Sequence, residues 1–275
     1  MTYAHIVTYI MAGLLGVCVG SFLNVVIYRL PNQMKLSKPA SHCPQCGYVL
    51  KWYDNIPVIS YIILGGKCRK CRKHIPFRYT AVELLNMVLW LVCVWRFYGD
   101  GNVFNWINMC VSAVVCSTLL VIFFTDLECM IIFDRFNIIL LVCGIVLIVS
   151  DGISQKMNGS AEMTVWEHIL GSLLAGGLFF LVFMGALAIL KREGLGGGDV
   201  KLAAAAGLVV GWKFALLGLL IASVVGSVVL SILNKKTHGG RNKEYPFGPF
   251  ITGGILISYL FCKPLITWYI DLLVK

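Results

Sequence analysis

The chain has 275 residues, of which 59% are hydrophobic and only 13% are charged, and its formal net charge is +10. Several apolar runs approach or exceed the roughly 20 residues that an α-helix needs to cross a bilayer. This composition excludes an ordinary soluble domain and predicts a polytopic membrane protein. The positive charge reports on orientation in the membrane and on anionic lipid, since no nucleic-acid-binding motif is found in the sequence.

Eight apolar segments predict an all-α polytopic membrane protein with about eight transmembrane helices, one of them short. They are residues 6–27, 80–95, 106–124, 131–149, 169–190, 200–210, 214–233 and 247–262. The sixth segment covers only some 16 Å at about 1.5 Å per residue, roughly half of the hydrocarbon core. We expect three regions: a first transmembrane helix over 1–30, a polar loop over 31–79 and a transmembrane domain over 80–275.

The distribution of charge predicts the orientation. The loop 31–79 holds nine Lys and Arg against the single acid Asp54, and such loops stay on the cytoplasmic side. The segment 234–245 is also basic and is expected on the same side, whereas 150–167 carries three acids and one Lys. Both basic loops are cytoplasmic only if 200–210 enters the membrane and turns near Gly211. Eight spans with both termini outside follow.

Four of the eleven cysteines have the spacing of metal ligands: Cys43, Cys46, Cys68 and Cys71. Two CxxC pairs separated by 21 residues predict a tetrahedral zinc site with four thiolate ligands. Zinc would supply folding free energy to a loop too small and too polar to build much of a core. Two disulfides are the alternative, which a reducing cytoplasm disfavours. Four protein ligands leave no open position, so the zinc is expected to be structural.

Acidic residues at two membrane edges are the candidate catalytic groups. Asp126 follows the third apolar segment, and Asp199 precedes the short sixth one within GLGGGDVK, residues 194–201. The expected topology places both acids on the cytoplasmic side, although 73 residues separate them. Two carboxyl groups within hydrogen-bonding distance share one proton, so such a pair can activate water and polarise a peptide carbonyl. Asp134 lies about 12 Å from Asp126 along a helix, too far to be the partner.

The residues around Asp199 suggest a substrate-binding loop. Gly196, Gly197 and Gly198 have no side chains and permit positive φ, so a substrate backbone could lie against this loop. The alternative is that Gly194 ends the fifth span as a C-cap and its neighbours form a loose turn. Lys201 is expected in the same active-site loop, and its alternative role is that of a snorkelling anchor or a cation paired with an acid.

These motifs resemble those of the bacterial type IV prepilin peptidases, polytopic aspartic enzymes of the GxGD kind. The matching stretches are 20–31 (GSFLNVVIYRLP), the paired CxxC, 55–60 (NIPVIS), 66–68 (GKC), 78–83 (RYTAVE), Asp126 with Asp134, 196–201 (GGGDVK) and 245–250 (YPFGPF). Each stretch is weak alone, whereas their order along nearly the whole chain is specific.

The resemblance implies that Asp126 and Asp199 are the two catalytic aspartates. It implies that the chain cleaves the basic leader from type IV prepilins or pseudopilins after a glycine, at the cytoplasmic face of the bacterial inner membrane. One departure is visible, because Phe133 precedes Asp134 where the family commonly has proline. We therefore expect Asp134 to support the fold, as the cap of the next helix, rather than to catalyse.

A second activity is implied by the loop 31–79. Members with this long cysteine-bearing loop also methylate the new amino terminus, with S-adenosylmethionine as the methyl donor. From their places in the family motifs, Gly66, Lys67 and Glu83 are the candidates for methyl transfer. The alternative for Lys67 is that it is one more positive charge of a cytoplasmic loop.

Two other classes of function remain as alternatives. In an ion- or proton-coupled transporter, Asp126 and Asp199 would bind a proton or cation, and the glycine turn would be a broken helix. A transporter predicts charges near the midplane of the membrane and repeated halves. In a noncatalytic assembly scaffold, the zinc module would dock cytoplasmic partners, and changes of carboxylate to amide would leave activity intact.

Overall fold

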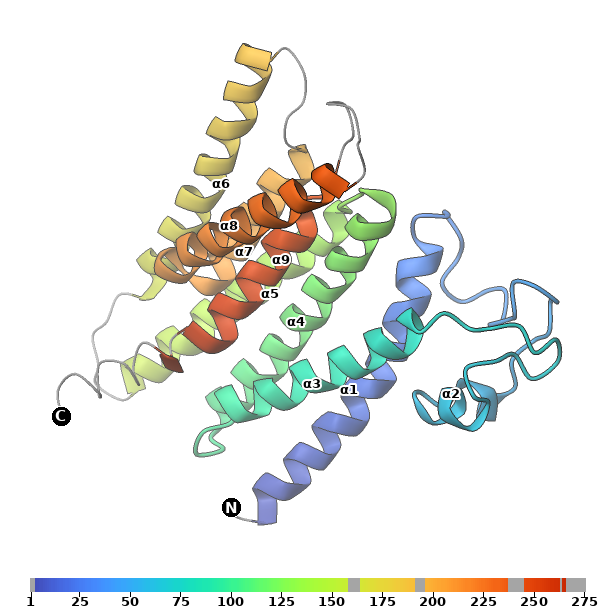
Figure 1. Cartoon of the computed structure of the whole chain (residues 1–275). Coiled ribbons are helices and arrows are strands. Elements are labelled where there is room, and N and C mark those ends of the chain that lie inside the picture. The colour runs from blue at the N-terminus through green and yellow to red at the C-terminus, as the bar shows by residue number, and fades with distance from the viewer. Residues whose placement is uncertain (1–2, 158–163, 191–195, 237–244, 263, 266–275) are drawn as a thin grey trace. The chain divides into compact units, whose positions relative to one another are not determined.

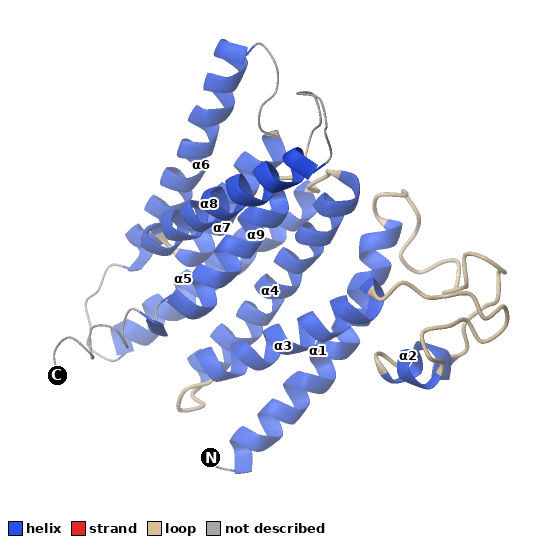
Figure 2. Ribbon diagram, viewed as in Figure 1, coloured by secondary structure: helices blue, strands red, loops and turns tan. Residues whose placement is uncertain are grey.

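The structure is a computed structural model that describes residues 3–157, 164–190, 196–236, 245–262 and 264–265. The chain divides into two compact units, Met1–Trp95 and Arg96–Lys275. Both units are helical (Figures 1 and 2), and β-structure in the described ranges is limited to two isolated bridges. The predicted all-α fold class is confirmed. The C-cap at Gly194 and most of the basic segment 234–245 lie outside the described residues.

Six helices in the described part of the chain are long and apolar enough to cross a membrane. They are α1 (Tyr3–Arg29), α3 (Arg78–Phe97), α4 (Val103–Cys129), α5 (Asp134–Met157), α6 (Thr164–Leu190) and α8 (Trp212–Lys236). Two shorter elements complete the predicted set: α7 (Gly197–Val210), and α9 (Gly248–Ile257) continued by the π-helical turn η2 (Ser258–Cys262). The polar loop contains η1 (Trp52–Asn55) and α2 (Ile59–Ile63). Two of the eight predicted membrane segments are therefore short, instead of one.

In the first unit, α1 and α3 pack closely because two glycines of α1 face α3. A Cβ atom on Gly20 would lie 2.7 Å from Glu83 Cα, and one on Gly16 would lie 3.0 Å from Met87 Cα. The side chain of Asn86 donates a hydrogen bond to the Gly16 carbonyl at 2.7 Å. Small residues that let two backbones approach are typical of helix pairs in membranes.

In the second unit, α4 is the central helix, since 67% of its most apolar 18-residue stretch is buried, against 17% of the corresponding stretch of α6. Helices α5 and α9 pack on α4, and α7 contacts both α5 and α6 (Figure 1). The helices α6 and α7 touch backbone to backbone, because a Cβ atom on Gly171 would overlap the carbonyl oxygen of Gly207. The outer face of α6 exposes Leu173 and Leu181, as expected for a helix that faces lipid.

Candidate active site and metal centre

Asp126 lies in the last turn of α4, before Met130 ends the helix in a left-handed conformation. The residue is 5% exposed, and its Oδ2 accepts a hydrogen bond from the backbone N–H of Gly248 at 2.9 Å. Gly248 is the first residue of α9, where N–H groups have no partner inside the helix. The carboxylate of Asp126 is therefore held by a helix N-terminus, which stabilises negative charge.

Asp199 lies in the first turn of α7 and closes that turn. Its Oδ2 accepts a hydrogen bond from the N–H of Gly196 at 3.2 Å, and its own N–H donates to the Gly196 carbonyl at 3.0 Å. The residue is 8% exposed, and Oδ1 is buried without a hydrogen-bond partner among the described residues. An unsatisfied buried oxygen costs about 1–3 kcal/mol. This oxygen therefore still lacks a hydrogen-bond donor in the described part of the structure.

The structure brings Asp126 and Asp199 together across 73 residues of sequence. The two carboxyl groups are close enough for their charges to interact. The start of α7 adjoins the link between α4 and α5, since a Cβ atom on Gly198 would lie 3.1 Å from Ile132. Both acids thus occupy terminal turns of their helices. A transporter with charges near midspan is not supported by this arrangement.

The glycines before Asp199 are more ordered than the sequence suggests. Gly196 is the N-cap of α7 with φ −75°, and Gly197 and Gly198 are already helical. None of the three uses the positive φ that glycine permits. The reason is the hydrogen bond from Gly196 to the Asp199 carboxylate, which starts the helix before the acid. A Cβ atom on Gly197 would meet nothing within 4 Å, which leaves open space beside Asp199.

Lys201 does not pair with either candidate catalytic acid. Its Nζ lies 2.8 Å from Oδ1 and 3.0 Å from Oδ2 of Asp134, the first residue of α5. Both side chains are exposed. This contact joins the first turns of α5 and α7, and the capping role of Asp134 stays a prediction.

Each CxxC pair forms the same tight turn in the polar loop. The N–H of each first cysteine donates to the carbonyl oxygen five residues later, at 2.9 Å in both turns. The residue after each second cysteine has a left-handed conformation, with φ 66° at Gly47 and φ 58° at Arg72. Glycine adopts this conformation without strain, whereas a residue with a Cβ atom does not. The two turns are therefore alike in backbone and unequal in strain.

The four cysteine sulfurs converge on one point. The Sγ atoms of Cys43 and Cys71 are 3.9 Å apart, as are those of Cys46 and Cys68. All four lie within 4.8 Å of one another and could hold a metal ion. Tetrahedral zinc with Zn–S bonds of about 2.3 Å requires sulfurs about 3.8 Å apart, so these residues fit zinc. All four cysteines are free, and the disulfide alternative, which needs about 2.05 Å, is wrong.

The protonation of the sulfurs also favours a cation. The N–H groups of Cys71 and Lys70 lower the pKa of the Cys68 thiol to about 6. The N–H of Tyr48 lowers the pKa of Cys46, but burial and the three neighbouring sulfurs raise it to about 11. Four crowded sulfurs cannot all be thiolates without a positive charge among them. A bound metal ion would supply that charge.

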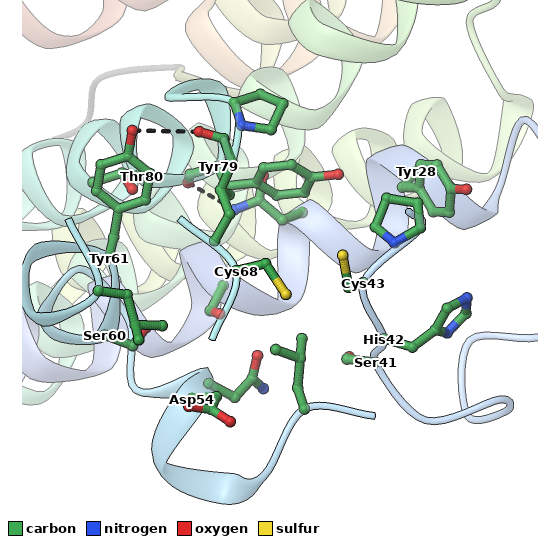
Figure 3. A pocket seen from close by; sticks show the side chains of 18 of the residues that line it. Tyr28, Ser41, His42, Cys43, Asp54, Ser60, Tyr61, Cys68, Tyr79 and Thr80 are labelled. Carbon is green, nitrogen blue, oxygen red and sulfur yellow. Dashed lines mark hydrogen bonds between the residues drawn. The ribbon is translucent and has the colours of Figure 1, made fainter. Parts of the chain in front are cut away.

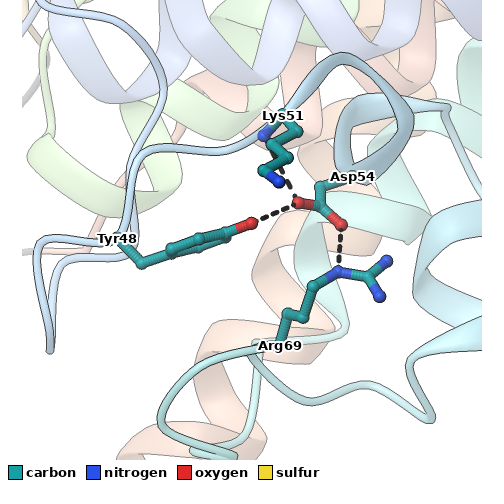
Figure 4. Close-up of polar contacts among 4 residues, drawn as sticks. All are labelled: Tyr48, Lys51, Asp54 and Arg69. Atoms are coloured by element: carbon teal, nitrogen blue, oxygen red, sulfur yellow. Dashed lines mark hydrogen bonds and ion pairs between the residues drawn. The ribbon is translucent and has the colours of Figure 1, made fainter.

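Asp54 ties the two halves of the metal module together (Figure 4). Its carboxylate accepts hydrogen bonds from Arg69 Nε at 2.7 Å, from the Tyr48 hydroxyl at 3.0 Å and from the Lys51 N–H at 3.3 Å. Burial raises the pKa of Asp54, but these hydrogen bonds outweigh it and the pKa is lowered. The ionised carboxylate therefore stabilises the folded module above the ordinary pKa of an aspartate. This contribution is lost as the pH falls through the lowered pKa.

The candidates for methyl transfer occupy different surroundings. Glu83 is buried and its Oε2 accepts a hydrogen bond from the Val58 N–H at 2.8 Å. Gly66 has φ 68°, and a Cβ atom there would meet the ring of Tyr61 at 2.9 Å. Glu83 and Tyr61 line one cavity, described below, whereas Gly66 does not line it but contacts two of its residues, Tyr61 and Ile75. Lys67 forms an isolated bridge with His74 beside the metal ligands and is not among the residues of that cavity.

The sequence alone assigns no role to Gly248 or Asn24, although both lie in stretches that carry the family resemblance. Gly248 belongs to the stretch 245–250, and the proline that follows it marks a helix start. The backbone contact of Gly248 with Asp126 leaves no chemical signature in a sequence. Asn24 belongs to the stretch 20–31, and an asparagine inside an apolar helix is the only signal it gives.

A multi-pass helical protein with two aspartates converging at helix ends, and a four-cysteine module between its first membrane helices, has the features of a membrane aspartic peptidase. The chain belongs to the type IV leader peptidase family, whose model matches residues 113–231. Residues 14–97 match the bacterial peptidase A24 N-terminal domain.

Several relatives extend the match over most of the chain. A prepilin leader peptidase/N-methyltransferase of Myxococcus xanthus is 37% identical over 84% of this chain, which spans 65% of that relative. The protein of the same name in Legionella pneumophila is 30% identical over 95% of this chain and 94% of its own length. The one in Pseudomonas aeruginosa is 30% identical over 86% and 85%. No solved structure matches the chain.

Proposed function

We propose that this protein is an aspartic endopeptidase that removes the leader from type IV prepilins or pseudopilins and then methylates the new amino terminus. The observation that carries the proposal is the convergence of Asp126 and Asp199 in terminal helix turns, with Oδ1 of Asp199 left without a partner. The family, and relatives named prepilin leader peptidase/N-methyltransferase, support the same activity.

In the proposed cleavage, the two carboxyl groups share one proton. The ionised carboxyl accepts a proton from a water molecule whose oxygen attacks the scissile carbonyl carbon, and the protonated carboxyl donates to the carbonyl oxygen. The tetrahedral intermediate then collapses, the C–N bond breaks, and the amine leaves with a proton. The Gly248 N–H fixes Asp126, while open space beside Gly197 admits the substrate backbone. No covalent acyl intermediate is required.

We propose three regions: a first transmembrane helix over 1–30, the metal and methyl-transfer module over 31–79 and the peptidase domain over 80–275. Zinc bound by the four cysteines is the structural metal of the module. The positive charge of 31–79 supports a cytoplasmic position for this module and for the active site, in the bacterial inner membrane. Anionic lipid is the expected neighbour of these charges.

The proposed methyl transfer uses the first unit. Glu83 is its candidate acidic group, while Gly66 and Lys67 are expected to shape the surrounding loop. When bound, S-adenosylmethionine supplies a methyl group whose bond to the sulfonium sulfur breaks, with the electron pair left on sulfur, as a bond to the amine nitrogen forms. The amine nitrogen then releases one proton to water.

Single changes of carboxylate to amide test the peptidase. Purified Asp126→Asn and Asp199→Asn proteins are each incubated with a prepilin, and their folding is checked by thermal unfolding. Each is expected to lose cleavage, because an amide cannot exchange the shared proton. The matched control is Asp151→Asn, at the far end of the same bundle, where Asp151 accepts a hydrogen bond from Asn108 at 2.7 Å. Full cleavage by either active-site variant would refute the proposed mechanism and favour a scaffold.

A further inference from the structure

The first unit contains a cavity of about 370 Å³ to which neither the cleavage nor the metal site assigns an occupant. Its wall is formed by the last turns of α1, the metal module and the first turns of α3. Figure 3 shows that tyrosine rings line it together with Cys43 and Cys68 of the metal cluster. The volume is in the range of small-molecule sites, which are about 300–1,000 Å³.

One polar atom in this wall lacks a partner. Asn24 is 5% exposed, and its Oδ1 is buried with no hydrogen bond among the described residues. The orientation of the amide is fixed, because Nδ2 donates to the Tyr79 carbonyl at 2.8 Å and lies 3.4 Å from the Gly20 carbonyl. Reversing the amide would place Oδ1 against these two acceptors. Asn24, which lines the cavity, therefore carries an acceptor that calls for a donor.

A second acceptor lies on the facing helix. Glu83 is one turn after Tyr79 on α3, and it is buried in the same wall. It accepts the N–H of Val58, which has φ 62° and is the centre of a tight turn closed by Ile59 N–H and the Pro57 carbonyl at 2.6 Å. Such a turn is rare and strained, and for a β-branched residue it is an outlier. Strained backbone of this kind clusters at ligand sites.

Three cationic side chains of the wall donate hydrogen bonds to protein groups, and one of them is paired with an acid. Arg29 donates to the carbonyl oxygens of three residues of its own loop, Arg69 pairs with Asp54, and Lys73 donates to Gln45. Among the groups that remain for a ligand are the acceptor oxygens of Asn24 and Glu83 and the tyrosine faces. These can hold a cation that carries hydrogen-bond donors.

We propose that this cavity binds S-adenosylmethionine, with its positively charged groups directed at Asn24 Oδ1 and the Glu83 carboxylate. The assignment rests on the proposed methyl transfer and names the site for its donor. It adds Asn24 as a binding residue. The metal would also help to shape the site, because two of its ligands, Cys43 and Cys68, form part of the wall.

The test measures binding of labelled S-adenosylmethionine to the purified full-length chain by equilibrium dialysis. Asn24→Leu removes the acceptor, and Glu83→Gln removes the charge while keeping an oxygen for the Val58 N–H. Each is expected to weaken binding about 10- to 100-fold. The matched control is Asn86→Leu, another buried asparagine between α1 and α3 that does not line the cavity. It is expected to bind within about threefold of the unaltered chain.

Prepilin cleavage by each variant reports that the fold is intact, and the mass of the cleaved pilin reports methylation. Wild-type affinity in both Asn24→Leu and Glu83→Gln would overturn the site, while methylation by the unaltered chain would leave the proposed function standing. If those variants instead raise only the KM for cleaved pilin, the pilin amine is the occupant and the donor assignment is wrong. If the unaltered chain neither binds S-adenosylmethionine nor methylates pilin, the methyl-transfer proposal fails too.

Discussion

Replacing Gly248 by alanine tests whether the start of α9 holds Asp126 in its catalytic position. The Gly248 N–H donates to Asp126 Oδ2 at 2.9 Å. A Cβ atom on Gly248 would lie 2.6 Å from that oxygen and 2.9 Å from Asp126 Cγ. Since ordinary contacts begin near 3.5 Å, the carboxylate must retreat by about 1 Å. The distance from the Gly248 nitrogen to Asp126 Oδ2 then exceeds that of an effective hydrogen bond.

The magnitude follows from this displacement. A hydrogen bond to a charged group contributes about 1.5–3 kcal/mol. If this contribution is lost from the transition state, kcat/KM falls by about 10- to 100-fold. The assay is cleavage of a purified prepilin by equal amounts of folded enzyme.

Gly253→Ala is the matched control for Gly248→Ala, because it lies in the same helix and its Cβ atom would meet nothing within 4 Å. Alanine in a helix interior is favoured over glycine, so this control should be neutral or slightly stabilising. Cleavage by Gly248→Ala within about threefold of the unaltered enzyme would contradict the reasoning, as would an equal loss in Gly253→Ala.

Five further substitutions, grouped into three tests, address the module and the surface. Cys43→Ser and Cys68→Ser each remove one of four sulfurs and should yield protein depleted of zinc by metal analysis; undiminished zinc would refute the four-sulfur site. Gly47→Ala should destabilise the metal module by about 1–2 kcal/mol, and Arg72→Gly should stabilise it by a similar amount. Release of zinc to a chelator should therefore become easier in Gly47→Ala and harder in Arg72→Gly. A shift in the same direction in both variants would contradict the strain argument. Lys201→Ala removes an exposed ion pair, so the free energy of unfolding, followed by thermal unfolding, should fall by less than about 1 kcal/mol. A larger loss would contradict the exposed position of this pair.

The sequence predicts the membrane helices well because hydropathy and helix length are local properties. It also indicates the four sulfurs, since CxxC spacing fixes two ligands in one turn. The first turn of α7 is different. Its glycines predict a loop from the sequence, but the hydrogen bond from the Gly196 N–H to Asp199 starts the helix there. The role of Gly248 is a backbone contact over 122 residues, which no residue type encodes. The unpartnered oxygen of Asn24 likewise exists only once α1 and α3 are packed.

The hydrogen bonds of Asp54 bear on how the module captures its metal. Asp54 lies in the 21 residues between the two CxxC pairs, and it contacts Tyr48, two residues after the first pair, and Arg69, inside the second pair. Closing a flexible loop costs chain entropy, and contacts that close it in advance lower that cost for the ion. The affinity for the ion is thus set partly by a carboxylate that never touches it. The metal affinity measured by competition with a chelator therefore depends on the hydrogen bonds of Asp54 as well as on the thiolate ligands.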